Sequence, residues 1–150
     1  MDRSDPHQSA KALVQCARYL RHRCSVGVFP EDTRSPDGRV LPFNDGALRL
    51  AIREQVPLLP VVLEGAGSAL PKNSCLFQGT QDIHLRILPA VPVEGWNTSQ
   101  SSVLREIVRQ RMIEELDRLR GGDHSPGDYQ ATSEIAIPDG VSVAAADADL

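Results

Sequence analysis

The sequence of 150 residues is poor in aromatic side chains, which make up only 4% of it. A core built from this sequence must therefore be mostly aliphatic. Proteins that bind single-stranded nucleic acid stack the bases on aromatic side chains, so this scarcity argues against that class. The net charge is −4, and the six charged residues after Arg120 are all acidic, so residues 1–120 carry a net charge of only +2. Such a weak positive charge does not indicate a surface for duplex nucleic acid.

Long apolar runs and paired cysteines are lacking as well. No stretch approaches the roughly 20 apolar residues that span a bilayer, and the best run, 56–63, holds two prolines. The polar N-terminus contains no secretory signal, so we expect any membrane contact to be peripheral. Cysteines occur only at Cys16, Cys24 and Cys75, without zinc-ligand spacing. We predict no metal site, and we expect Cys16 and Cys24 to be buried in a protein of a reducing, cytoplasm-facing location.

Helical and strand patterns alternate along the chain with short connections. Apolar residues on one face predict helices over 6–22, 46–55 and 102–120. Two short apolar runs, 24–29 and 56–63, predict strands buried on both faces, as in a parallel sheet. The order of elements predicts an α/β fold with a mostly buried sheet flanked by helices.

The ends of these elements carry further signals. Asn44 or Asp45 is placed to cap the second helix, and 83–87 alternates as a half-exposed strand does. Residues 121–150 are acidic, rich in small residues and proline, and aperiodic, which predicts a disordered tail after a folded domain of residues 1–120. Arginines alternate with acidic residues along 102–120, which predicts a solvated helix face. These arginines are Arg105, Arg109, Arg111, Arg118 and Arg120.

The segment 29–35 concentrates the residues most suited to chemistry. It follows directly from a predicted buried strand, and ligands of open α/β sheets bind beyond the carboxyl ends of strands. Arg34 supplies a planar, permanently charged fork for a phosphate, and Thr33 adds a hydroxyl. Glu31 can orient Arg34 or accept a hydrogen bond from a substrate hydroxyl. The segment predicts an anion site, and a surface loop with a Glu–Arg pair is the open alternative.

Three motifs resemble those of one family. The letters V-F-P-E-D-T-R-S at 28–35 resemble the F-P-E-G-T-R-S motif of the bacterial lysophosphatidate acyltransferases, which are glycerolipid acyltransferases. The letters V-P-L-L-P-V at 56–61 are similar to the family's V-P-I-V-P-V motif, and M-D-R at 1–3 is similar to the end of its F-I-D-R motif. The resemblance covers about residues 1–120 and implies part of the glycerolipid-acyltransferase fold.

The resemblance implies an activity and its substrates. A fatty acyl group would pass from a co-substrate, acyl-coenzyme A or acyl carrier protein, to the free hydroxyl of lysophosphatidic acid or a related glycerol phosphate, with no cofactor or metal. The matched residues for the acceptor phosphate are Arg3, Glu31, Thr33 and Arg34. The implied location is peripheral, at the cytoplasmic face of the membrane. The chain itself is expected to be soluble, with membrane contact made by a missing N-terminal part.

Two departures from the family pattern qualify this picture. The family's general base is the His of an H-x-x-x-x-D motif that precedes F-I-D-R, and no such motif occurs in this sequence. The resemblance therefore predicts that the catalytic segment lies upstream of Met1, in a truncated or mis-started chain; a non-catalytic remnant that binds glycerol phosphates is the alternative. Asp32 stands where the family has Gly. Asp tolerates left-handed backbone, but its charge about 4 Å from a phosphate would repel it by roughly 1–4 kcal/mol.

Overall fold

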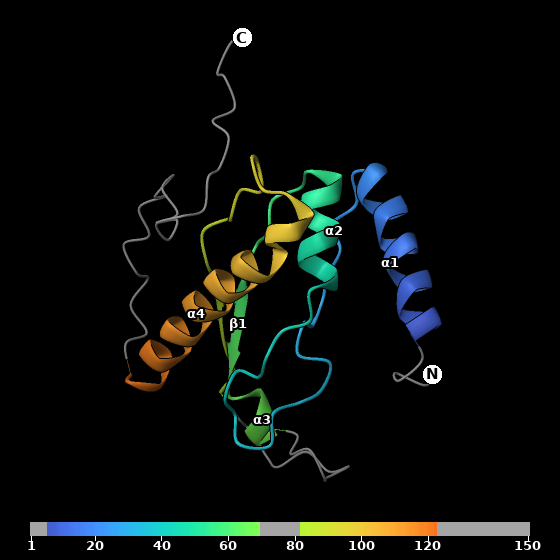
Figure 1. Ribbon diagram of the computed structural model, residues 1–150. Helices are drawn as coiled ribbons and strands as arrows, with labels where there is room; N and C mark the ends of the chain where they lie inside the picture. The colour runs from blue at the N-terminus through green and yellow to red at the C-terminus, as the bar shows by residue number, and fades with distance from the viewer. Residues whose placement is uncertain (1–5, 70–81, 123–150) are drawn as a thin grey trace.

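A computed structural model of the chain describes residues 6–69 and 82–122, and it combines four helices, a short 3-10 turn and two strands (Figure 1). The three long helices expected from periodicity are confirmed within two residues at each end. Arg3, Cys75 and residues 123–150 lie outside the described ranges, so the expectations for them, the acidic tail included, stay predictions. The elements are α1 (Pro6–Arg21), α2 (Gly46–Glu54), β1 (Val61–Glu64), α3 (Ala66–Ala69), β2 (His84–Ile87), η1 (Thr98–Gln100) and α4 (Ser101–Arg120).

The main core lies where α2 packs beside the first half of α4. Leu104 of α4 and Val91 and Val93 of the segment after β2 are completely or almost completely buried there. Trp96, the single tryptophan, lies in a loop, and its side chain is buried in the same cluster. The prediction of a mostly aliphatic core, made from the scarcity of aromatics, is therefore confirmed.

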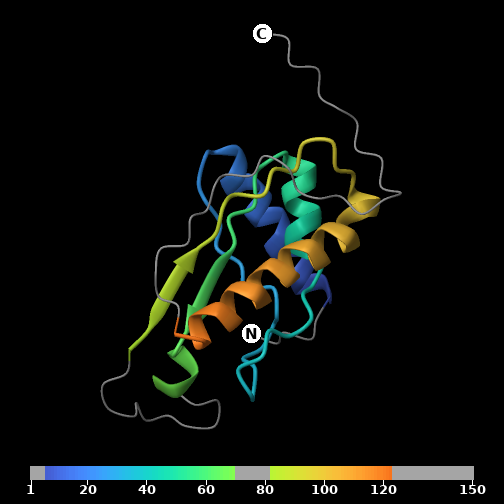
Figure 2. The same cartoon turned by 90° about the vertical axis from the view of Figure 1, so that its left-hand side faces the viewer.

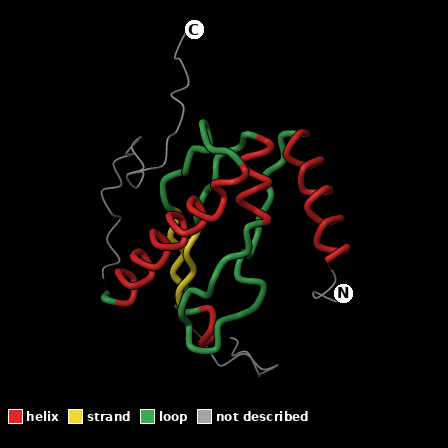
Figure 3. Tube along the Cα trace, in the orientation of Figure 1, coloured by secondary structure: helices red, strands yellow, loops and turns green. Residues whose placement is uncertain are grey.

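The two strands pair with each other in antiparallel register, with Val61 opposite Ile87 (Figures 2 and 3). The second half of α4 covers one face of this pair, where Val62 and Leu88 join a cluster with α4 residues. On the other face Leu85 is 58% exposed and Ile87 is 55% exposed. The prediction of a strand buried on both faces is therefore wrong for β1, whose Val61 and Leu63 are 38% and 45% exposed, and the prediction of a mostly buried sheet is wrong with it.

The strand predicted over 24–29 does not form, and this is the largest correction to the fold. Those residues have no strand assignment, Val28 is 48% exposed and Phe29 is 84% exposed. A strand needs a neighbour that takes its backbone hydrogen bonds. Among the described residues, strand pairing is confined to β1 with β2 and a single bridge from Leu58 to Val91. Cys24 is exposed with this segment rather than buried, and Cys16 of α1 is half-buried.

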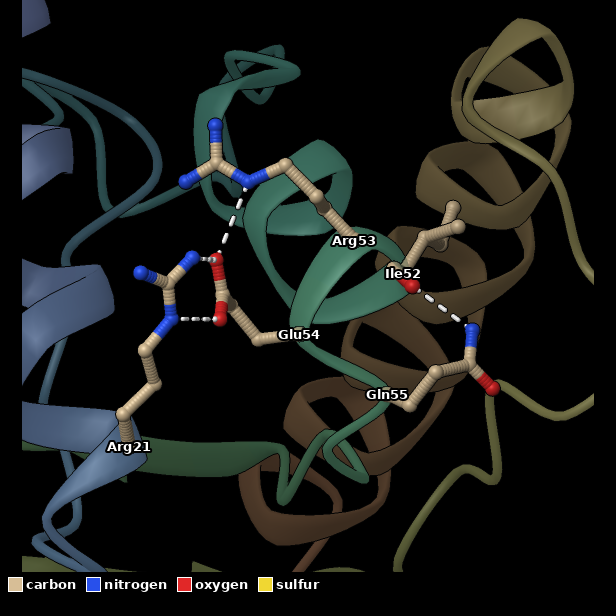
Figure 4. A network of polar contacts seen from close by, with 5 residues as sticks. All are labelled: Arg21, Ile52, Arg53, Glu54 and Gln55. Atoms are coloured by element: carbon tan, nitrogen blue, oxygen red, sulfur yellow. Dashed lines mark hydrogen bonds and ion pairs between the residues drawn. The ribbon is translucent and has the colours of Figure 1, made fainter.

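An ion-pair clasp joins α1 to α2 (Figure 4). Arg21 donates from Nε and Nη2 to the two carboxylate oxygens of Glu54, at 2.7 and 2.9 Å, and Arg53 donates to the same carboxylate at 3.1 Å. The Glu54 side chain is only 7% exposed. The hydrogen bonds from Arg21, followed by those from Arg53 and the charges of both, hold the pKa of Glu54 below its ordinary value.

This clasp predicts an acid-sensitive docking of α1. Because the folded pKa of Glu54 is depressed, its contribution to stability is present above the ordinary carboxyl pKa of about 4.3 and is lost as the pH falls through the folded value. We expect Glu54→Gln to lower helix content near neutral pH and to flatten the acid limb of the unfolding free energy, measured by circular dichroism in denaturant between about pH 3 and 7. The matched control is Glu94→Gln at an exposed loop position, which should leave the acid limb unchanged. An unaltered pH profile in Glu54→Gln would show that the clasp does not stabilise the fold.

Candidate functional site

Residues 30–44 fold back on themselves, so that the start and the end of this loop are hydrogen-bonded together. The Asn44 N–H donates to the Pro30 carbonyl at 2.9 Å, and the Asn44 side-chain amide donates to the Asp32 carboxylate at 2.7 Å. The Leu41 N–H donates to Oε2 of Glu31 at 2.8 Å. Three bonds from two residues at the loop's end therefore fix the three residues that begin it. We call this segment the 30–44 loop.

Asp32 has a left-handed backbone at the first bend of the loop. Its φ is +60°, and the Thr33 N–H closes the bend on the Glu31 carbonyl at 2.7 Å. Asp is among the few residues other than Gly that tolerate this conformation, as expected from the sequence. Its carboxylate accepts from the Asn44 side chain, and Asn44 is not the cap residue of α2. Asp45 occupies the cap position but makes no side-chain cap bond, and it pairs instead with Arg105 at 2.8 Å, so the predicted capping role is wrong.

The tip of the loop bends at Pro36-Asp37-Gly38. The Ser35 hydroxyl donates to the Asp37 carboxylate at 2.8 Å, and the Arg39 N–H donates to the same oxygen at 3.1 Å. These two bonds, that from Arg39 first, lower the pKa of Asp37. Gly38 has a φ of +76°, and a Cβ there would lie 2.8 Å from Nη2 of Arg120, so both conformation and space favour glycine.

Three arginines of α4 bind the second half of the loop and the residue that follows it. Arg109 donates from Nε to the Leu41 carbonyl and from Nη2 to the Val40 carbonyl, each at 3.0 Å. Arg120 donates to the Gly38 carbonyl at 2.7 Å. The Arg105 bond to Asp45 lies one residue beyond the loop. The prediction of a merely solvated arginine face on α4 is therefore wrong for these three arginines.

The structure brings together three of the four residues predicted to bind the acceptor phosphate. Glu31 is half-buried and engaged with the Leu41 backbone, whereas Thr33 and Arg34 are exposed on the same bend. Arg3 lies outside the described residues. Thr33 and Arg34 thus place a hydroxyl and a guanidinium on neighbouring residues of this bend.

Within 6–69 and 82–122, no group of three or more His, Cys, Asp or Glu side chains is placed to hold a metal ion. In the same part of the chain, every helix is too short or too polar to cross a bilayer.

Comparisons with known proteins place this geometry in a family. Residues 1–64 match the family model described as Acyltransferase. The human 1-acyl-sn-glycerol-3-phosphate acyltransferase alpha is 36% identical over 130 residues, which are 86% of this chain and 46% of the human protein. A putative enzyme of the same name from Caenorhabditis elegans is 30% identical over 114 residues, 75% of this chain and 40% of the relative.

A solved structure agrees with these sequences. The crystal structure of the 1-acyl-sn-glycerophosphate acyltransferase PlsC from Thermotoga maritima superposes with a TM-score of 0.66 at 32% identity, and the match covers 73% of this chain and 44% of that one. The chain therefore belongs to the acyltransferase family. The relatives it matches are the 1-acyl-sn-glycerol-3-phosphate acyltransferases, as the three motifs indicated, and it spans less than half of their length.

Proposed function

We propose that this chain forms the acceptor-binding part of an acyltransferase of phospholipid biosynthesis. The complete reaction transfers a fatty acyl group from acyl-coenzyme A or acyl carrier protein to the free hydroxyl of lysophosphatidic acid and yields phosphatidic acid. The relatives, which are named 1-acyl-sn-glycerol-3-phosphate acyltransferases, support the reaction class. The proposal for this chain rests on the 30–44 loop, in which hydrogen bonds fix the backbone that carries Thr33 and Arg34.

In this proposal the loop binds the phosphate of the acceptor. Arg34 forms charge-assisted hydrogen bonds to two phosphate oxygens, and the Thr33 hydroxyl donates to a third. Arg3 is the second cation of the site, and Glu31 completes the set taken from the family motif. Peripheral contact with the cytoplasmic face of the membrane brings the acceptor lipid to this loop.

The chemical step needs a base that this sequence does not contain. We propose that a segment with the H-x-x-x-x-D motif supplies it, and that its His takes the proton from the acceptor hydroxyl. The hydroxyl oxygen then attacks the thioester carbonyl, the C–S bond breaks and the thiol leaves with a proton. The second candidate function is a non-catalytic module that binds glycerol phosphates through the same loop. The lack of H-x-x-x-x-D in the 150 residues favours this module for the chain on its own.

Direct binding tests the part that both functions share. In a titration of the purified chain with glycerol 3-phosphate, we expect the backbone amide signals of Thr33 and Arg34 to shift saturably in ¹⁵N–¹H spectra. Glycerol at equal concentration should produce no shift, because it lacks the phosphate. Shifts confined to residues outside the 30–44 loop, or none at all, would contradict an acceptor site here.

A further inference from the structure

We propose that Arg109 of α4 is a positioning residue for the 30–44 loop, and that it acts through the peptide of Leu41 and the carboxylate of Glu31. The inference rests on the proposed function, because the loop that it positions is the proposed phosphate site. It assigns Glu31 a different role from the substrate contact that the motif implies.

The contacts form a continuous chain from α4 to the bend. Arg109 donates to the carbonyls of Val40 and Leu41, and the Leu41 N–H donates to Oε2 of Glu31. Both polar groups of Leu41 are thereby engaged. Glu31 lies only three residues before Arg34, so whatever fixes its carboxylate also restricts where the Arg34 backbone can lie.

The guanidinium of Arg109 is itself held in place. Its third nitrogen, Nη1, donates to Oε1 of Glu106 at 2.9 Å, one turn earlier on α4. The Arg109 side chain is 22% exposed, so these bonds are only partly in competition with water. Val40 packs beside both apolar clusters, which explains why its carbonyl and that of Leu41 need a donor from the protein.

The bond that Glu31 makes indicates a positioning role for its carboxylate. In the structure Oε2 of Glu31 accepts from a backbone N–H ten residues ahead, and this bond is half-buried. The bond needs an oxygen acceptor but not a charge, so Gln can partly replace Glu in this role, whereas Ala cannot.

The experiment compares the affinity for glycerol 3-phosphate with the stability of the variants. We expect Arg109→Ala to raise the Kd for glycerol 3-phosphate about 10-fold, as when a competent loop conformation falls to about a tenth of the population. The matched control is Arg111→Ala on the same helix, which should leave this Kd unchanged. Unfolding followed by the fluorescence of Trp96 should remain close to wild type in both, because the main core is untouched.

The second part of the experiment uses substitutions of Glu31. Glu31→Ala should repeat the loss seen in Arg109→Ala, and Glu31→Gln should recover part of it. Because both residues act on one peptide, the double variant Arg109→Ala with Glu31→Ala should lose no more than either single variant. The proposal would be overturned if the two losses of affinity multiplied in the double variant, or if Glu31→Gln lost as much affinity as Glu31→Ala.

Hydrogen exchange tests the positioning contact without depending on ligand binding, so it separates this inference from the proposed function. The Leu41 amide should exchange faster in Arg109→Ala and Glu31→Ala and at the wild-type rate in Arg111→Ala. If the wild-type chain binds no glycerol 3-phosphate, the proposed function fails, while faster exchange still supports the positioning contact. Unchanged exchange at Leu41 in Arg109→Ala would overturn it. Should Arg109→Ala not fold, Arg109→Lys, which can serve one carbonyl instead of two, is expected to give an intermediate exchange rate.

Discussion

The purified 150-residue chain is expected to transfer no acyl group from acyl-coenzyme A to lysophosphatidic acid. General-base catalysis contributes about 10²- to 10⁴-fold to such a reaction, and the H-x-x-x-x-D motif that supplies the base in the family does not occur in this sequence. The measurement is formation of radiolabelled phosphatidic acid by the chain alone. A relative of full length, such as the Thermotoga maritima enzyme, assayed in parallel shows that the substrates are competent.

Turnover by the chain alone would require a different base. Glu31, a carboxylate of the motif near Thr33 and Arg34, is our nominee, and it already accepts the Leu41 N–H. Glu31→Gln would then abolish that turnover. Turnover that survives Glu31→Gln would contradict both this prediction and the placement of chemistry on the 30–44 loop.

The helices could be predicted from the sequence because the information for them is local. An apolar stripe recurs at helical spacing in α1, α2 and α4, and it predicted all three within two residues. Alternation at 83–87 likewise predicted β2, but its apolar residues Leu85 and Ile87 are the exposed ones, so the pattern did not predict which face is buried. The 56–63 run yielded only β1 at its end, after a stretch with two prolines that cannot donate to a ladder.

The remaining features depend on contacts between distant parts of the chain. Apolar character at 24–29 indicates a strand, but a strand exists only with a neighbour, and composition does not say which segment provides one. The role of Arg109 was missed because its partners are backbone carbonyls 68 and 69 residues earlier, which leave no trace in residue type. The i, i+4 spacing of Arg105 and Arg109 was the one available signal, since it places both on a single face of α4.

Arg34→Ala should cause the largest loss of acceptor binding of any single substitution in the loop. Hydrogen bonds to charged groups contribute about 1.5–3 kcal/mol, so the Kd for glycerol 3-phosphate should rise roughly 10- to 150-fold. Arg34→Lys should recover only part of the affinity, because a point charge cannot reproduce the planar fork. The matched control is Arg39→Ala, an exposed arginine of the same loop that pairs with Asp37. Equal losses in the two alanine variants would indicate a diffuse charge effect instead of a site at Arg34.

Asp32 provides the complementary change, because its charge opposes the phosphate that Arg34 holds. At an exposed position about 4 Å from a phosphate, removal of this charge should gain about 1 kcal/mol, or roughly 5-fold in Kd. Asp32→Asn keeps a side chain that tolerates a φ of +60° and an oxygen that can accept from Asn44, so it should show the full gain. Asp32→Gly removes the charge and the Asn44 bond together, so its gain should be smaller. If only Asp32→Gly improves binding, the backbone and not the charge limits this loop, and unchanged acceptor affinity in Arg34→Ala would place the phosphate elsewhere altogether.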